Sequence, residues 1–458
     1  MTGADGRHEP IPEELASAAN GRHEPIPEEP ASAANGRHEG LTGVPLKHEA
    51  ISATLAGEIA AGSFTQGAQL PGELALAQRF GVSRTTVRAA LADLTRGGLI
   101  ATRIGKGSFV QPRGVPRATA TGGESTLSER ALGALLGLAI GDALGMPTQL
   151  LSRDQIVDAH GPVLSGFEPA PAGHPIAAGM TAGQVTDDTE QAVILAEVLI
   201  AGGGEIDAHE LAARLVAWEA DMRARGSLDL LGPSTRRALT ELLAGGDVET
   251  TGRSGDTNGA AMRITPVGIA TEPDAAAIVA AVEAASRVTH NTSIALAGAS
   301  AVAAAVSAGV AGLGYDAAID HALAAATSGA GRGRWVAGAD VASRIRWAIG
   351  LVAGLDDPDA CDLIQRLVGT SLATQESVPA AFALWSLHPE DPWLTSRLGA
   401  SVGGDCDTIA AMAGAMSGAL VGPAGFPAEV VAHLHAANPA LDLPGLAVGL
   451  LALRAGAR

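Results

Sequence analysis

Between residues 51 and 96 the apolar positions predict three short helices. The first has Ile51, Leu55 and Ile59 on one face. The second opens at Pro71-Gly72, because Pro favours the first turn of a helix, and it ends at Phe80, where the following glycine suits a helix stop. The third begins after Ser83, a favoured N-cap residue, and faces a core with residues at i, i+3, i+4, i+7 spacing: Val87, Ala90, Leu91 and Leu94.

After the third helix the pattern predicts a β-hairpin. Leu99–Arg103 and Ser108–Val110 read as strands around the tight turn Gly105-Lys106-Gly107. Helix, turn, basic helix and hairpin is the order of a winged helix-turn-helix. Arg84 and Arg88 would then enter the major groove, where Arg reads guanine bidentately, and Lys106 would meet phosphate or the minor groove. The spacing alone also fits a three-helix protein-interaction module with solvated arginines.

The rest of the chain predicts an all-α body. Its apolar residues are mostly Ala, Leu and Val, and Ala and Leu favour helices. Ile294 to Tyr315 runs 22 residues without a charge, which is long enough to span a bilayer. Because this run consists mostly of Ala, Gly and Ser, we expect a helix buried against other helices and no membrane contact.

Composition and repeats divide the chain into four parts. Residues 1–43 hold a 15-residue tandem repeat, GRHEPIPEELASAAN at Gly6–Asn20 and GRHEPIPEEPASAAN at Gly21–Asn35, too polar to form a core, so we expect disorder. Residues 44–112 form the predicted DNA-binding domain. Residues 113–128 are rich in Pro, Gly, Ser and Thr and predict a linker. Residues 129–458 form the predicted helical domain.

Charge and cysteine content narrow the class of protein. The 458-residue chain has a net charge of −19, yet residues 44–113 carry eight Lys and Arg against four Asp and Glu. A basic block in an acidic protein suits a local nucleic-acid contact. Two cysteines provide no disulfide framework, and the first residues contain no secretory signal, so we expect a cytoplasmic protein.

Two acidic clusters carry the candidate chemistry of the helical body. Thr186-Asp187-Asp188 and Asp405-Cys406-Asp407-Thr408 each sit where a helix should start. Either cluster alone is explained by helix capping, since Thr and Asp are favoured there. Together they offer carboxylate and hydroxyl oxygens, which suit Mg²⁺ or Mn²⁺ better than zinc. A pair of such ions activates water for cleaving a bond.

The basic block resembles the DNA-binding domain of GntR-type bacterial regulators. The stretch LPGELALAQRFGVSRTTVRAALADLTRGGLIATRIGKGSFV carries the resemblance, above all VSRTTVRxAL followed by a G-x-G wing. It implies operator DNA as a partner and a homodimer on palindromic half-sites. The implied DNA contacts are Arg84, Thr85, Thr86, Arg88, Lys106 and Gly107. Gly72 replaces a usual capping Ser, and Leu74 replaces an Arg that often reaches DNA, which affects affinity and operator choice.

The helical body resembles the ADP-ribosylglycohydrolase family, which includes the dinitrogenase-reductase-activating glycohydrolases. The ordered segments GDALG, TDDT, NGAAMR, TH and GGDCDT carry this resemblance. It implies an all-α fold with two Mg²⁺ (or Mn²⁺) ions that hydrolyses N- or O-glycosidic bonds to ADP-ribose. The implied ligands of one ion are Thr186, Asp187 and Asp188, those of the other are Asp405 and Thr408, and Asp407 bridges them.

The resemblance also implies catalytic roles and a substrate pocket. Asp187, Asp188 and Asp407 would be catalytic. Asn258 and Gly259 would hold ribose or phosphates through backbone amides, Arg263 would pair with phosphate or form a structural ion pair, and His290 would line the pocket or serve as a core histidine. These residues, with Gln149, are the predicted substrate contacts.

Two departures leave two functions open. Gln149 stands where several relatives have a metal-binding Glu, and an amide cannot act as a general base. Cys406 stands where Thr is common, and is either oxidation-sensitive or a buried inert thiol. The first function is a DNA-bound, metal-dependent glycosidase acting on ADP-ribose or a related nucleoside or nucleotide. The alternative is a transcription factor whose weakened glycohydrolase domain only senses a nucleotide-sugar or nucleoside.

Overall fold

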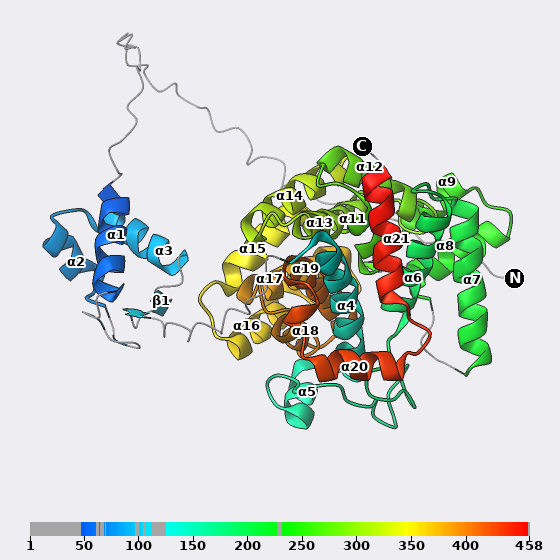
Figure 1. Cartoon of the computed structure of the whole chain (residues 1–458), viewed down its shortest axis with the longest axis horizontal. Coiled ribbons are helices and arrows are strands. Elements are labelled where there is room, and N and C mark those ends of the chain that lie inside the picture. The colour runs from blue at the N-terminus through cyan, green and yellow to red at the C-terminus, as the bar shows by residue number, and fades with distance from the viewer. Residues whose placement is uncertain are drawn as a thin grey trace, which may run out of the picture.

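The computed structural model describes residues 47–60, 64, 68, 70–96, 100–103, 107–110, 125–226 and 231–456. The described residues form two separate hydrophobic cores, one within residues 51–110 and one within residues 131–450 (Figure 1). The predicted tail (1–43) and most of the predicted linker lie outside the described residues. The helical part begins at Leu127, slightly before the predicted boundary at 129, because Thr126 and Glu129 form a capping box there.

The smaller unit has the predicted winged-helix order. It contains α1 (Lys47–Ala60), α2 (Glu73–Phe80), α3 (Arg84–Arg96), β1 (Ile100–Arg103) and β2 (Gly107–Val110). The strands pair antiparallel, with Ile100 opposite Val110. Gly81 ends α2 in the left-handed conformation with φ 63°, as its position predicted. Ser83 caps α3, since its hydroxyl accepts a hydrogen bond from the Thr86 amide at 3.2 Å.

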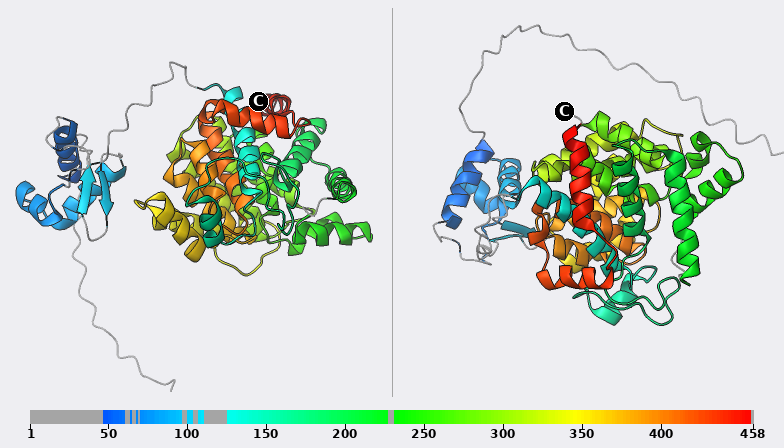
Figure 2. Two further views of the ribbon diagram at one scale, coloured as in Figure 1. Left: turned by 90° about the horizontal axis from the view of Figure 1, so that it is seen from below. Right: turned by 45° about the vertical axis from the view of Figure 1, so that its right-hand side comes forward.

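The larger unit forms helices joined by loops in its described residues, with two isolated β-bridges, Thr257 with Ala373 and Thr292 with Arg334. Its first helices are α4 (Leu127–Gly145), α5 (Arg153–His160), α6 (Asp187–Ala201), α7 (Ala208–Ala224), α8 (Pro233–Leu243), α9 (Val248–Thr251), η2 (Gly252–Ser254), α10 (Gly259–Met262), α11 (Thr265–Ala270) and α12 (Ala275–Ser286). The chain continues through α13 (Ser293–Val310), α14 (Tyr315–Gly329), α15 (Val341–Val352), α16 (Asp357–Leu363), the π-helix η3 (Ile364–Val368), α17 (Thr374–Leu387), α18 (Pro392–Gly399), α19 (Cys406–Val421), η4 (Pro423–Gly425), α20 (Ala428–Ala437) and α21 (Leu443–Gly456). The C-terminal α21 packs across α4, α6 and α11 (Figure 2).

The helices α4 and α19 make the closest approach in this unit. Gly137, Gly141 and Gly145 of α4 face the backbone of α19. A Cβ at Gly137 would lie 2.0 Å from the carbonyl oxygen of Gly414, and one at Gly145 would lie 2.2 Å from Cα of Asp407. Only glycine permits this approach, and it sets the amino end of α19 against the carboxyl end of α4.

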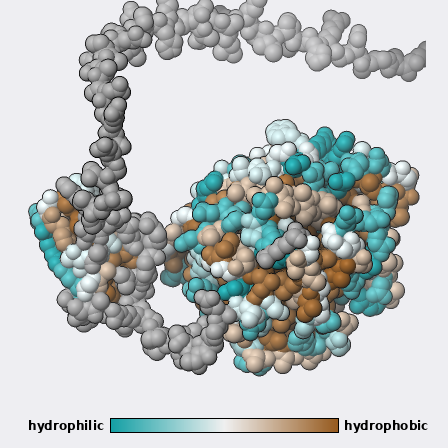
Figure 3. Space-filling view, turned by 45° about the horizontal axis from the view of Figure 1, so that its top comes forward, coloured by the Kyte–Doolittle hydropathy of each residue, from teal (hydrophilic) through white to brown (hydrophobic). Residues whose placement is uncertain are grey.

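The long uncharged run is a core helix. It forms α13, in which every residue is buried, and which packs on α11, α12, α14 and α19. Among the described residues α13 alone is long and apolar enough to cross a membrane, yet the whole of its apolar window is enclosed by protein. On the face of the unit shown in Figure 3, hydrophilic and hydrophobic residues are interspersed.

Candidate active site

The two acidic helix starts meet in space. Asp187 is the first residue of α6 and follows Thr186, while Asp405 directly precedes α19. The Thr408 hydroxyl in the first turn of α19 donates a hydrogen bond to Oδ2 of Asp188 in α6, at 3.2 Å. Two clusters that are more than 200 residues apart in sequence therefore share one site.

Thr186 occupies the N-cap position of α6, but its side chain does not cap the helix. Its hydroxyl donates to Oδ1 of Asp142 at 2.6 Å, and the Thr189 hydroxyl donates to Oδ2 at 2.5 Å. The backbone amides of both threonines also donate to this carboxylate. Asp142, which comes from α4, thus stabilises the amino end of α6 with its charge.

Sequence reasoning did not single out Asp142. The sequence did contain a signal, because Asp142 is the one charged residue in the apolar run from Ala131 to Gly145. A charge in such a run is expected to be buried, and a buried carboxylate needs hydrogen-bond or ion-pair partners. Burial raises the pKa of Asp142 to about 6, although the hydrogen bonds from Thr186 and Thr189 oppose this rise.

Asp188 lies at the centre of the negative charge. Its side chain is buried, and Oδ1 has no hydrogen-bond partner among the described residues. Burial raises the pKa of Asp188 well above its ordinary value, and repulsion from four further carboxylates adds to the rise: Asp407, Asp187, Asp142 and Asp405. A cation would relieve both the missing contact and the repulsion.

The chemistry of the available donors fits Mg²⁺ or Mn²⁺. In the part of the chain that the structure describes, no three His, Cys, Asp or Glu side chains are arranged as a metal-binding group. Mg²⁺ does not require such a group, because it is commonly held by one or two carboxylates and several waters. The oxygens that could serve come from Thr186, Asp187, Asp188, Asp405, Asp407 and Thr408. All are hard donors.

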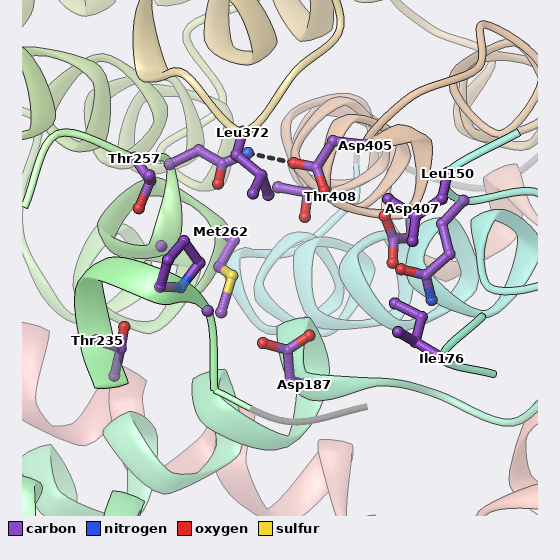
Figure 4. Close-up of a pocket in the computed structure, with 15 residues that line it drawn as sticks. Leu150, Ile176, Asp187, Thr235, Thr257, Met262, Leu372, Asp405, Asp407 and Thr408 are labelled. Atoms are coloured by element: carbon purple, nitrogen blue, oxygen red, sulfur yellow. Dashed lines mark hydrogen bonds between the residues drawn. The ribbon is translucent and has the colours of Figure 1, made fainter. Parts of the chain in front are cut away.

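A pocket of about 240 Å³ opens beside these carboxylates (Figure 4). Asp187, Asp405 and Asp407 point into it from the starts of α6 and α19. The remaining lining residues are polar or aliphatic: Gln149, Leu150, Ile176, Gly232, Pro233, Thr235, Thr257, Asn258, Gly259, Met262, Leu372 and Thr408. A small molecule bound there would lie against the carboxylates.

Gln149 lines this pocket, and Nε2 of its buried side chain has no partner within the described residues. The turn that carries it is fixed from two sides. Nδ1 of His174 accepts a backbone amide at 2.9 Å, so Nε2 carries the proton and donates to the carbonyl of Gln149 at 2.9 Å. The next residue, Leu150, has φ 63°, and its amide donates to the carbonyl of Gly404. A strained residue beside a pocket is typical of a functional site.

The structure revises the predicted role of the loop at Asn258. The backbone amide of Asn258 donates to the carbonyl of Leu372 at 2.9 Å, so this N–H is already engaged within the protein. The residue itself lines the pocket, and its contact with a substrate stays a prediction. Its side-chain amide donates to Oδ2 of Asp405 (dashed in Figure 4) and to Ser377. Burial raises the pKa of Asp405 to about 6, and its side-chain hydrogen bonds with Asn258 and Thr408 partly offset the rise. Gly259 lines the pocket, and the predicted contact of its backbone amide with a substrate stays a prediction.

Arg263 does not face the pocket. Its guanidinium is buried and donates to Oε1 of Gln191 at 3.1 Å and to the Thr289 hydroxyl at 2.6 Å. Gln191 in turn donates to Oδ2 of Asp187 at 2.8 Å. Burial lowers the pKa of Arg263 to about 10, and the charge of Asp187 opposes that change. The predicted phosphate contact is therefore replaced by a structural role behind the carboxylates.

His290 also lies behind the pocket wall rather than in it. Its Nδ1 contacts the Thr289 hydroxyl at 2.8 Å, and its Nε2 contacts the Thr257 hydroxyl, which does line the pocket, at 3.0 Å. Gly259 leaves the space for the ring, since a Cβ there would lie 2.8 Å from Cε1. Sequence reasoning missed Thr257, although it stands beside the Asn-Gly turn that was singled out.

Cys406 is an inert, buried thiol. Its Sγ lies 3.3 Å from the Thr148 hydroxyl. Burial, followed by the charge of Asp407, raises the pKa of this thiol far above its ordinary value. Of the two predicted alternatives, the structure favours the inert one, because a reactive cysteine needs a lowered pKa and access to solvent.

In the winged-helix unit, α3 presents the predicted recognition residues. Arg84 and Arg88 are exposed, and Thr86 is half-buried beside Ser83. The side chain of Thr85 and the whole of Lys106 lie outside the described residues, while Gly107 is the first residue of β2. Gly72 precedes α2 without a side-chain cap, as its lack of a side chain requires.

Comparisons with known proteins cover both units. Residues 123–458 match the family model for ADP-ribosylglycohydrolase, and residues 47–110 match that for bacterial regulatory proteins of the gntR family. An uncharacterized protein, YegU of Escherichia coli (strain K12), is 35% identical over 329 residues, which are 71% of this chain and 98% of that protein. The ADP-ribosylarginine hydrolase Tri1 of Pseudomonas putida (strain GB-1) is 31% identical over 66% of this chain and 73% of its own length. A solved structure titled ADP-ribosylglycohydrolase-related protein complex covers 71% of this chain and 98% of its own, with a TM-score of 0.51 and 23% identity, which supports the fold.

Proposed function

Because this chain belongs to the ADP-ribosylglycohydrolase family and carries a GntR-type DNA-binding domain, we propose that it is a DNA-bound, metal-dependent glycoside hydrolase. Its substrate would be ADP-ribose or a related nucleoside or nucleotide bearing an N- or O-glycosidic bond. The observation that carries this proposal is the buried group of carboxylates around Asp188, whose Oδ1 lacks a hydrogen-bond partner in the described structure. Buried charges of one sign persist when a cation compensates them.

The residues at the two helix starts would hold two Mg²⁺ or Mn²⁺ ions. We assign Thr186, Asp187 and Asp188 to one ion, Asp405 and Thr408 to the other, and Asp407 to both. The Thr186 hydroxyl donates its proton to Asp142, so its oxygen can face a cation with a lone pair. When bound, such a pair supplies Lewis acidity and lowers the pKa of water.

We propose different roles in the hydrolysis for the individual carboxylates of the site. Asp187 and Asp407 line the pocket, whereas Asp188 lies behind it, so we assign proton transfer from the attacking water to Asp187. Arg263 and Gln191 hold Oδ2 of Asp187 in place. Asp142 orients the start of α6 and with it the position of Asp187.

Metal binding and turnover test the proposal together. Calorimetry with Mg²⁺ and Mn²⁺ should show binding to the full chain, and Asp188→Asn should weaken it by about tenfold or more, as loss of a carboxylate ligand does. With Mg²⁺ the chain should hydrolyse at least one of ADP-ribosylated peptide, O-acetyl-ADP-ribose and simple nucleosides. An empty site at millimolar metal would refute the hydrolase.

The second candidate is a transcription factor that senses a nucleotide-sugar or nucleoside. Gln149 favours it, because the pocket is lined there by a buried neutral amide, where the family resemblance implies a carboxylate. No turnover on any substrate, combined with tight ligand binding that alters operator affinity, would select the sensor. For either function the partners we propose are operator DNA and a second copy of the chain bound with it.

A further inference from the structure

The volume of the pocket bears on the size of the substrate, and this inference rests on the proposed function. The pocket holds about 240 Å³, below the roughly 300–1,000 Å³ that pockets for drug-sized ligands occupy. ADP-ribose joins two riboses, an adenine and a diphosphate, whereas a nucleoside contains one ribose and one base. The volume suits the smaller molecule.

In the described structure no Lys or Arg lines the pocket that could hold a diphosphate. The charged residues that line the pocket in the described structure are Asp187, Asp405 and Asp407. Diphosphates are usually held by Arg or Lys, and Arg263 is already engaged behind the wall. The amino end of α8 offers only a partial positive charge, and Pro233 there has no N–H.

The apolar part of the wall offers no ring for stacking an adenine. It is built from Leu150, Ile176, Met262 and Leu372, and no Phe, Tyr or Trp lines the pocket within the described residues. Proteins that hold bases commonly stack them on aromatic side chains. Aliphatic residues can instead cover one face of a single base or a small leaving group.

The polar part of the wall contains a hydroxyl that can donate a hydrogen bond to a ligand. The Thr289 hydroxyl accepts a hydrogen bond from Arg263, and its own proton can go to Nδ1 of His290. Burial and the charge of Arg263 lower the pKa of His290, which favours the neutral ring, and in this arrangement the one ring N–H lies at Nε2. This N–H donates to Thr257 Oγ1, which leaves the Thr257 proton to be donated elsewhere. Since Thr257 lines the pocket, that proton is available to a ligand.

We propose that the pocket takes an uncharged, nucleoside-sized ribosyl compound, and that Thr257 donates a hydrogen bond to one of its oxygens. In the reaction, water adds to the anomeric carbon of ribose while the bond from that carbon to nitrogen or oxygen breaks. The leaving group keeps the electron pair and takes up a proton, so ribose and the protonated leaving group are the products. No oxidant or reductant is needed.

A substrate series with one leaving group tests the substrate class. The full chain with Mg²⁺ is assayed against 4-nitrophenyl ribofuranoside, its 5-phosphate and its ADP derivative, each as both anomers, and binding is measured by calorimetry. Because the lining offers phosphate neither a Lys nor an Arg, we expect kcat/KM for the neutral compound to exceed that for either phosphorylated compound by about tenfold or more, which corresponds to roughly 1.4 kcal/mol. Tighter binding or faster cleavage of the ADP derivative would overturn the inference and leave the hydrolase standing. Binding of the neutral compound without cleavage would overturn the hydrolase and leave the substrate class standing, and failure to bind any of the three would overturn both.

Two variants of Thr257 form a matched pair. Thr257→Val keeps the shape and removes the donor, so we expect kcat/KM to fall about tenfold, as expected for a hydrogen bond made in the pocket. Thr257→Ser keeps the hydroxyl and should retain most of the activity. If the Val variant is as active as the parent protein, the proposed role of Thr257 is wrong. If the Val and Ser variants have the same melting temperature, the difference in their activity does not come from folding. The missing cation is tested by Leu372→Arg, which should lower the ratio of kcat/KM for the neutral compound to kcat/KM for the phosphorylated compounds.

Discussion

Gly141 of α4 tests whether the contact between two helices holds the active site together. A Cβ at this position would lie 2.2 Å from the carbonyl oxygen and 2.4 Å from the carbonyl carbon of Ala410 in α19. Since non-bonded carbons prefer separations of about 3.5–4.0 Å, Gly141→Ala would have to move the helices apart by about 1 Å. Overpacking typically costs roughly 1–3 kcal/mol. Because the obstructing atoms are backbone and cannot rotate away, we expect a loss of at least about 3 kcal/mol.

The same displacement would disturb the site. Asp142 follows Gly141 directly, and Asp407 lies at the other end of the contact, where its Cα faces Gly145. Separation of the helices would therefore pull the acidic helix starts apart. We expect affinity for Mg²⁺ to fall about 10- to 100-fold, the range seen when the groups that support metal ligands are lost.

Guanidinium unfolding followed by tryptophan fluorescence measures the stability of the larger unit alone, because all five tryptophans lie within it. Calorimetry measures the metal affinity. Gly350→Ala is the matched control: this residue is exposed on α15, and a Cβ there meets no atom within 4 Å. Replacing a helical Gly by Ala should then stabilise the protein by about 0.5–1 kcal/mol. If Gly141→Ala also stabilises the chain, or binds Mg²⁺ like the parent, the helix contact does not position the site.

Three further predictions follow from individual residues. In the parent protein the Asp142 carboxylate accepts hydrogen bonds from Thr186 and Thr189, and Asp142→Asn would place an amide N–H against these donors, so the free energy of unfolding should fall by about 3 kcal/mol. Unchanged stability in the fluorescence assay would contradict the capping role of Asp142. Burial raises the pKa of Cys361 to about 12 and also raises that of Cys406, so neither thiol should react with Ellman's reagent at pH 8 until the protein is unfolded. Rapid labelling of the native chain would show that our account of their burial is wrong. The double variant Arg84→Ala/Arg88→Ala should abolish specific operator shifts while the calorimetric melt of the full chain, which includes the winged-helix unit, stays the same. Unchanged operator binding would refute the assignment of α3.

The sequence was informative about helix ends because their signals are local. Ser83 and Gly81 mark the boundaries of α3 and α2 as expected. The acidic clusters do begin α6 and α19. Thr186 does stand at the N-cap position of α6, but its hydroxyl does not cap the helix, because it has a stronger partner in a buried carboxylate on another helix.

The order of the motifs and their family resemblance were enough to locate the winged helix, the helical body and the acidic clusters along the chain. Only the tertiary structure decided which polar groups meet: Asp142 with the start of α6, and Arg263 with Thr289 behind the pocket instead of with a ligand. A periodic hydrophobic pattern or a helix cap depends on residues only a few positions away, so it can be recognised in a single sequence. The partner of a buried polar group depends on distances between segments far apart in the chain, and these are set by packing such as the glycine contact of α4 with α19.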